Sequence, residues 1–488
     1  GNLMKRPDET SAPPPGAPAP PPAPGSERLG HKLARQCPTL RRFSRVLLVA
    51  FPLIGFVLCA AFGVWEWKAH SLYKEARAAS GAAGIPDSIS AWRTLNPVGV
   101  PPGQNAAYEY SAAFLLAQST SESSPLWKHG QWEYRYMWQY TSIEDATRLR
   151  EAVKTQDALL SLFHDAAVKK QCLYTQELLP RSCLLNERSP HLNRVRIAAD
   201  ILAAAASVDA EDGHWQKALQ RYRDCMALAD SFRNTPGIAA ASARLYAAKR
   251  ALQALEYAVA SREISSGELK TLQSEFERRA REYSPVDALK TELILWNETI
   301  EDFRKGRTTW KEFLANAMGT TNPDAGPLEY VPRIMFNGYF KADQARLTNY
   351  MLMLIDDIES NPANPEKSQL LSMQYRRGYL GASALVSDKA QSFAFTATMH
   401  HRLSLRAAAA GMALCRFEKD HGVLPEDLSE LVPDYLSADV LVDDNGSQLS
   451  CFKTPLGPGV FGVCNEEIQG ESKFTIRTTS PSEETGDE

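Results

Sequence analysis

VLLVAFPLIGFVLCAAFGVW, from Val46 to Trp65, is a run of twenty residues without a charge. A helix rises about 1.5 Å per residue, so this run is long enough to cross a hydrocarbon layer about 30 Å thick. Trp65 and Trp67 stand at its end, where amphipathic rings favour the membrane interface. The sequence therefore predicts a single transmembrane helix over residues 46–67 and makes the lipid bilayer a partner of the chain.

The run has two other interpretations, a buried core helix and a cleaved signal peptide. A core helix of this length, however, seldom consists of apolar residues throughout. A cleaved signal peptide would need an unusually long charged region of 45 residues, with Cys59-Ala60-Ala61 as its cleavage site. We favour a retained anchor, and the sequence leaves cleavage open.

Charge is distributed unevenly around the predicted anchor. Residues 1–45 hold eight Lys/Arg and three Asp/Glu, a net charge of +5, so the total of −4 leaves −9 for the rest. The positive-inside rule places the N-terminus in the cytoplasm and the remainder on the periplasmic, extracytoplasmic side of a bacterial membrane. This acidic charge argues against general nucleic-acid binding by the ectodomain, since binding of phosphates depends on Lys and Arg.

Both ends of the chain are predicted to be disordered. Residues 1–45 contain the Pro/Ala tract Ser11–Ser26 and form a basic, proline-rich cytoplasmic tail. Residues 479–488 form an acidic tail. Glycine and proline punctuate residues 68–104, which predicts a stalk and loop after the anchor.

Helical periodicity dominates residues 105–385, the predicted α-helical ectodomain. Two helical hairpins are predicted within residues 191–282, and the first matches the spacing of the tetratricopeptide repeat (TPR). The matching residues are Leu202, Ala206, Ala218, Tyr222 and Cys225. Asp209 and Asp230 break the pattern and no further copy follows, so we predict an irregular, TPR-like layer.

A small α+β module is predicted over residues 386–478. Its first helix covers about 390–420, ends at Gly422 and is followed by a short second helix. Three short strands follow, near Leu449–Lys453, Val460–Cys464 and Lys473–Thr478. Further helices of the ectodomain are predicted over 142–169, 285–305 and 340–359. The fold class is therefore mainly α.

Six cysteines lie in the predicted ectodomain, an even number in an oxidising compartment. Cys451 and Cys464 are equidistant from a turn-rich Pro-Leu-Gly-Pro-Gly segment, which predicts that they face each other as a disulfide across a hairpin. Cys172 and Cys183 bracket a short loop and form the second predicted pair. The pairing of Cys225 and Cys415 is left open, because both lie in helical stretches.

The stretch LSLRAAAAGMALCRFEKDHGVLPEDLSELVPDYL, residues 403–436, precedes an Asp443-Asp444-Asn445-Gly446 turn. With PPGQNAAYEYSAAFLL at 101–116 and PRIMFNGYFKADQARLTNYML at 332–352, it resembles an uncharacterised family of membrane-anchored proteins of planctomycetes and verrucomicrobia. That family has no assigned activity, so the resemblance implies an architecture and no reaction.

Residues 386–478 also resemble the globular part of type II secretion pseudopilins, which implies a long helix, a loop, a short helix and a small sheet. The anchor departs from that family, because Arg45-Val46 and Pro52 stand in place of its processing site and glutamate. Some pseudopilins bind calcium in their final loops, which makes Asp443 and Asp444 weak calcium candidates. EF-hand spacing fails there, since Leu441 occupies the first ligand position.

No motif for a nucleotide, zinc or acyl-transfer site occurs in the chain. The adjacent His400 and His401 point about 100° apart on a helix and cannot easily share a metal. His421 at a helix end is explained by the helix dipole, and the carboxylates of 298–302 by a solvated face. We therefore assign no catalytic residue and no cofactor, although a site assembled from distant residues stays open.

The leading hypothesis is a membrane-tethered structural or interaction protein, a scaffold or accessory subunit of a cell-envelope assembly with protein partners there. Whether it is an enzyme is uncertain, with a non-enzyme favoured. One alternative is an envelope enzyme with a site in the cleft between the helical layer and the C-terminal module. The other is a calcium-stabilised component like those of secretion systems.

Overall fold

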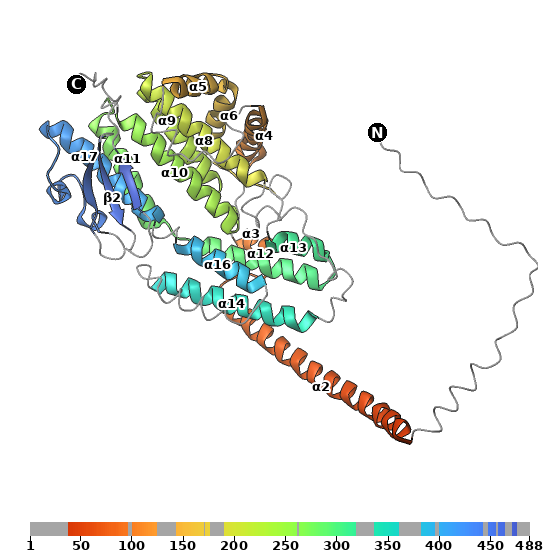
Figure 1. Ribbon diagram of the computed structural model, residues 1–488. Helices are drawn as coiled ribbons and strands as arrows, with labels where there is room; N and C mark the ends of the chain where they lie inside the picture. Colours follow the sequence, from red (N-terminus) through yellow and green to blue (C-terminus); the bar gives the residue numbers. More distant parts are fainter. Residues whose placement is uncertain are drawn as a thin grey trace, which may run out of the picture. The chain divides into compact units, whose positions relative to one another are not determined.

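Helices make up most of the described structure (Figure 1). The computed structural model describes residues 38–95, 100–123, 143–169, 171–175, 190–260, 263–318, 336–360, 382–395, 400–442, 448–454, 457–463 and 471–475. The chain divides into two units, residues 1–67 and 68–488, which are described separately. The mainly α class predicted from the sequence is confirmed.

Helix α2 (Pro38–Ala82) contains the predicted anchor and is far longer than predicted. Between Phe51 and Trp67 large apolar side chains are exposed all round the helix, with Phe51 and Phe56 at 70% and 73%. Its part from Ala50 to Ala82 is long and apolar enough to cross a membrane, by length and composition. The helix also continues over residues 68–82, where a stalk and loop were predicted, because Leu, Ala, Lys, Glu and Arg in this stretch all favour helix.

Helices α8 (Pro190–Glu211) and α9 (Trp215–Ser231) form the first predicted hairpin, turning at Gly213 with a positive φ of 76°. Helix α10 (Ile238–Ala260) packs on both of them. The five residues that match the repeat spacing are all buried. Alanines at 203–206 are completely buried, and small side chains of this kind let helix backbones approach closely.

Shorter helices pack on this layer. Helix α4 (Ala107–Ser123) contacts α8 and α6 (Asp157–Val168), and α5 (Ile143–Lys154) contacts α8. The single helix predicted over 142–169 is thus two, separated at Thr155-Gln156, where a β-branched residue and a buried glutamine interrupt the apolar period.

The second predicted hairpin is wrong in its packing. Helix α11 (Ser266–Glu282) begins at the predicted capping box of Ser265 and Glu268, but its main contact is with α17 (Arg402–His421) in the C-terminal part. Periodicity shows which face of a helix is apolar and does not show which helix covers it.

A third group of helices lies below this layer in Figure 1. Helix α12 (Val286–Arg304) packs on α14 (Asn337–Ser360), and α14 on α16 (Ala382–Phe395). Helices α3 (Ile89–Leu95) and α13 (Trp310–Met318) contact α12. The rings of Phe303, Trp310, Phe313 and Phe340 cluster here, with centroids 4.5–6.1 Å apart.

The C-terminal part places α17 against a three-stranded antiparallel sheet, β1 (Ser450–Thr454), β2 (Gly457–Val463) and β3 (Glu471–Thr475), in that order. Helix α17 ends at Gly422 in the left-handed conformation, as predicted. The described 3-10 turns are Pro102–Gln104, Leu428–Leu431 and Ala438–Val440.

The sheet register corrects the argument for one disulfide. Cys451 pairs with Val460, because the hairpin turns between Thr454 and Gly457 rather than at Gly457. The prediction that Cys451 faces Cys464 across the hairpin is therefore wrong. Cys183 and Cys464 lie outside the described residues, and no disulfide joins cysteines within them. The Cys172–Cys183 pair stays a prediction.

Candidate functional site

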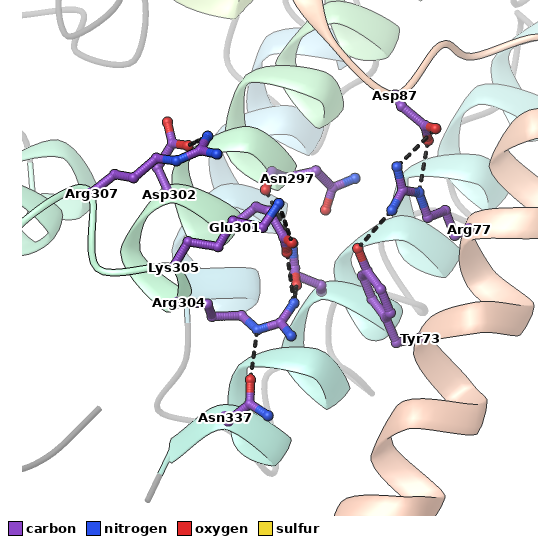
Figure 2. Close-up of polar contacts among 11 residues, drawn as sticks. Tyr73, Arg77, Asp87, Asn297, Glu301, Asp302, Arg304, Lys305, Arg307 and Asn337 are labelled. Atoms are coloured by element: carbon purple, nitrogen blue, oxygen red, sulfur yellow. Dashed lines mark hydrogen bonds and ion pairs between the residues drawn. The ribbon is translucent and has the colours of Figure 1, made fainter. Parts of the chain in front are cut away.

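The last turns of α2 belong to the unit 68–488 and bury one face there. Ala69, Ala76 and Ser80 lie on one face of the helix and are 2%, 3% and 8% exposed. Their spacing of seven and four residues places them on one stripe, which is the face that α2 buries. Figure 2 shows the polar side chains beside this stripe: Arg77 bonds to Tyr73 and Asp87, and a separate group of polar contacts lies on α12.

Arg77 is the central residue on the α2 side. Its guanidinium donates to Asp87 at 2.9 Å and to the hydroxyl of Tyr73 at 3.3 Å. The hydrogen bond from Arg77 lowers the pKa of the Asp87 carboxyl, and the same bond raises the pKa of Arg77. Arg304 of α12 lies over the Tyr73 ring, 5.4 Å from its centre. The Arg77 contacts stay within α2 and the segment that follows it, so the contact of Arg304 with Tyr73 is the one of these that links α2 to α12.

Helix α12 supplies the opposite wall. Glu301 binds Arg304 at 2.7 Å and Lys305 at 3.1 Å, and Asp302 binds Arg307 at 3.1 Å. A cavity of about 390 Å³ lies between the two walls. Among its carboxylates, Glu301 and Asp302 pair with neighbouring cations and Glu298 accepts the N–H of Ile89, which does not favour a site for proton transfer.

One atom of this cavity stands out. The side-chain oxygen of Asn297 is buried and accepts no hydrogen bond among the described residues, while its amide nitrogen lies 3.5 Å from Thr348. A buried acceptor without a donor is unfavourable unless water or a ligand reaches it. The cavity therefore has room and one acceptor for a small polar molecule.

A second cavity, of about 200 Å³, lies between residues of α9, α10, α11, α12 and α17. We call it the arginine cavity. Four arginines line it together with Asp230, Tyr283 and His401, the arginines being Arg233, Arg244, Arg278 and Arg279. It occupies the place where a cleft between the helical layer and the C-terminal part was expected.

Arg279 organises one wall of the arginine cavity. It donates to both carboxylate oxygens of Asp230, at 2.9 and 2.7 Å, and to Glu275 at 2.8 Å. Burial acts against its charge, but these carboxylates raise its pKa overall. Bidentate pairing of this kind fixes both side chains in one orientation.

The positive charge of Arg244, by contrast, is only weakly neutralised by neighbouring carboxylates. Its nearest carboxylate oxygen is Oδ1 of Asp230 at 3.9 Å, and its guanidinium lies 5.7 Å from the centre of the Tyr283 ring. Burial lowers the pKa of Arg244, with Tyr283 and Asp230 opposing. The ring of His401 meets Tyr283 edge-on at 4.8 Å, and burial beside Arg244 and Arg279 lowers the pKa of His401 to about 3. His401 is therefore neutral at physiological pH.

The other residues singled out from the sequence have structural contacts. His421 stacks on Phe417 at 4.1 Å and its Nδ1 lies 3.1 Å from the Phe417 carbonyl oxygen. Glu298 accepts the backbone N–H of Ile89 at 3.1 Å and so caps α3. Asp443 and Asp444 lie outside the described residues, within which no group of three His, Cys, Asp or Glu could hold a metal ion.

Sequence reasoning missed Arg77, Arg244 and their partners. Arg244 and His401 are brought together by helices far apart in the chain, and neither stands in a local motif. A conspicuous signal was nevertheless present, since a helix as alanine-rich as α10 carries Arg244 among small buried residues.

The chain matches no protein-family model, no curated protein and no solved structure at a significant level. Its function must therefore be argued from the two sites above.

Proposed function

We propose that this chain is a membrane-tethered structural or interaction protein, a scaffold or accessory subunit of a cell-envelope assembly. One observation carries the proposal: the exposed apolar helix of 50–67 continues without a break over residues 68–82, where Ala69, Ala76 and Ser80 are buried in the second unit. The continuous helix joins the apolar span directly to the second unit, and the contact of Arg304 with the Tyr73 ring links its last turns to α12, as a tether for an assembly requires.

The proposed topology rests on the charge of the N-terminal tail, and the proposed role of each part rests on the resemblances found in the sequence. The N-terminus lies in the cytoplasm and the ectodomain in the periplasm, as the basic tail supports. The α8–α9–α10 layer is TPR-like, and such helical layers offer surfaces for protein partners. The C-terminal helix and three-stranded sheet are pseudopilin-like.

The topology is tested with epitope tags at the two ends of the chain, in spheroplasts treated with protease. We expect loss of the C-terminal tag and protection of the N-terminal tag until detergent is added. The reverse pattern would contradict the orientation, and release of a soluble ectodomain that carries the C-terminal tag and lacks the N-terminal one would indicate a cleaved signal.

The assembly is tested by native mass spectrometry of the full chain, isolated from gently solubilised membranes with and without prior chemical cross-linking. We expect a defined complex that contains this chain in fixed stoichiometry. A monomer under several detergents, even after cross-linking, would remove the scaffold hypothesis.

A second candidate function is an envelope enzyme. The observation that favours it is the arginine cavity, which contains His401 with a lowered pKa, while neither His421 nor the carboxylates of 298–302 line it. Turnover of a small anionic substrate that is lost in Arg244→Gln would support the enzyme over the scaffold. A calcium-stabilised component stays a third prediction, and an unchanged melting temperature on chelation would remove it.

A further inference from the structure

The arginines that line the arginine cavity outnumber the carboxylates that line it, while Glu275 beside the cavity also binds Arg279. Four arginines face three carboxylates there, Asp230, Glu282 and Asp287. With His401 neutral, the lining has a net charge of 4 − 3 = +1. The end of the cavity formed by Ser284 and Pro285 is the N-terminus of α12, a helix of 19 residues whose dipole adds partial positive charge.

The pairing pattern shows which arginines carry the excess. Arg279 engages Asp230 through two hydrogen bonds, and Arg278 binds Glu282 on its own helix. Arg244 reaches Asp230 only at 3.9 Å, beyond hydrogen-bonding distance, and Arg233 has no ion pair among the described residues. Two guanidinium groups on the rim and wall of one cavity are thus left with donors to spare.

Arg244 is 26% exposed and has lost much of its water, and a guanidinium in such a place is unfavourable unless an anion replaces that water. Arg244 rests on the Tyr283 ring and lies close enough to Arg233 and Arg279 for both to lower its pKa further. A carboxylate or phosphate beside Arg244 would accept two parallel N–H groups and relieve this repulsion.

We propose that the arginine cavity binds a small organic anion through a carboxylate or phosphate group held by Arg244 and Arg233. The rest of the ligand lies against the apolar side of the cavity, where Trp92, Met226 and Leu405 line it. The volume of about 200 Å³ is below that of pockets for drug-sized molecules, so the ligand is of metabolite size.

Isothermal titration calorimetry of the full chain in detergent micelles tests the site, with inorganic phosphate and succinate as probes and chloride at matched ionic strength as reference. We expect saturable one-to-one binding of at least one probe, and the tighter probe identifies the chemical group. Arg244→Gln should weaken that binding at least ten-fold. Arg281→Gln is the matched control, because Arg281 lies on α11, is exposed and does not line the cavity.

Arg244→Gln is also checked for folding by circular dichroism. If that variant does not fold, Arg233→Gln decides, because Arg233 is exposed and its removal should leave the fold intact while weakening binding. Absence of saturable binding of both probes would overturn the proposal. So would binding that is unchanged in Arg233→Gln and Arg244→Gln, or equally weakened in Arg281→Gln.

Discussion

Individual buried charges hold the helical body at defined points. Glu292 of α12 is completely buried and accepts the backbone N–H of Ile238 at 2.8 Å, the first residue of α10. The Glu292 carboxylate also accepts a hydrogen bond from Nε1 of Trp296 at 2.9 Å, and its Oε1 lies 3.3 Å from Nζ of Lys389. One carboxylate therefore caps a helix, orients an indole and neutralises a lysine on a third helix.

Glu292→Gln should lower the free energy of unfolding by about 2 kcal/mol, because a buried charge-assisted cap and its lysine lose their counterpart. Urea unfolding of the ectodomain measures the effect. Glu282→Gln is the control: Glu282 is half exposed and pairs with Arg278, so its loss should change stability by less than about 1 kcal/mol. Equal effects of the two substitutions would contradict the capping role of Glu292.

His401 makes stability depend on pH. Its pKa is about 3 in the folded chain, because of burial and of Arg244 and Arg279, against about 6.5 when unfolded. Between these values the unfolded chain binds one more proton, so acid favours unfolding; above pH 6.5 the residue contributes no pH dependence. The loss approaches about 1.4 kcal/mol per pH unit below pH 6.

The difference between wild type and His401→Gln isolates this contribution from the carboxylates that also titrate. Chemical unfolding at pH 8, 7, 6 and 5 should show wild type losing stability faster than the variant below pH 6.5. Parallel curves over the whole range would show that folding does not lower the pKa of His401.

At the scale of elements, the contact of α17 with the sheet depends on one glycine. A Cβ built on Gly411 would lie 2.6 Å from Cδ1 of Phe474, a β3 side chain that is 1% exposed. The aromatic ring is packed on all sides and cannot give way by the distance required.

Gly411→Ala should therefore destabilise the ectodomain by about 1–3 kcal/mol, although alanine favours helix. Gly81→Ala is the matched control on α2, where nothing lies within 4 Å of the added Cβ, and it should stabilise by up to about 1 kcal/mol. Thermal melts of both variants check the opposite signs. A stabilising Gly411→Ala would mean that the sheet is not held against α17 as described.

Most helices could be predicted because their apolar periodicity, caps and glycine stops are local. The capping box at Ser265 and the end of α17 at Gly422 were found in this way. The helix that packs on α11 could not be predicted from the sequence. Whether α11 packs on α17 or on α10 depends on how much surface each contact buries, and α17 is distant in the chain. The hairpin register failed for a similar reason: several glycines and prolines offered turns, and only the pairing across the sheet selects one. The cavities could not be predicted either, because their walls come from helices that are far apart in the chain.

At the scale of the molecule, the chain divides at residue 67 into two units, yet α2 belongs to both. Residues 68–82 contribute Ala69, Ala76 and Ser80 to the interior and Tyr73 and Arg77 to polar contacts. Residues 68–82 are thus a part of the folded second unit, and this distinguishes them from a flexible stalk, which could be removed without effect.

A chain that starts at Lys68 should be monomeric without detergent and as stable as the full chain, because the exposed apolar residues before it add nothing to the second unit. A chain that starts at Ala83 should unfold with a free energy about 2 kcal/mol lower, since it loses the buried face of α2 and the stacking of Arg304 on Tyr73. Urea unfolding of the two chains side by side measures the difference. Equal stability would make residues 68–82 a passive linker, and the anchor could then hold the body near the membrane without fixing its position.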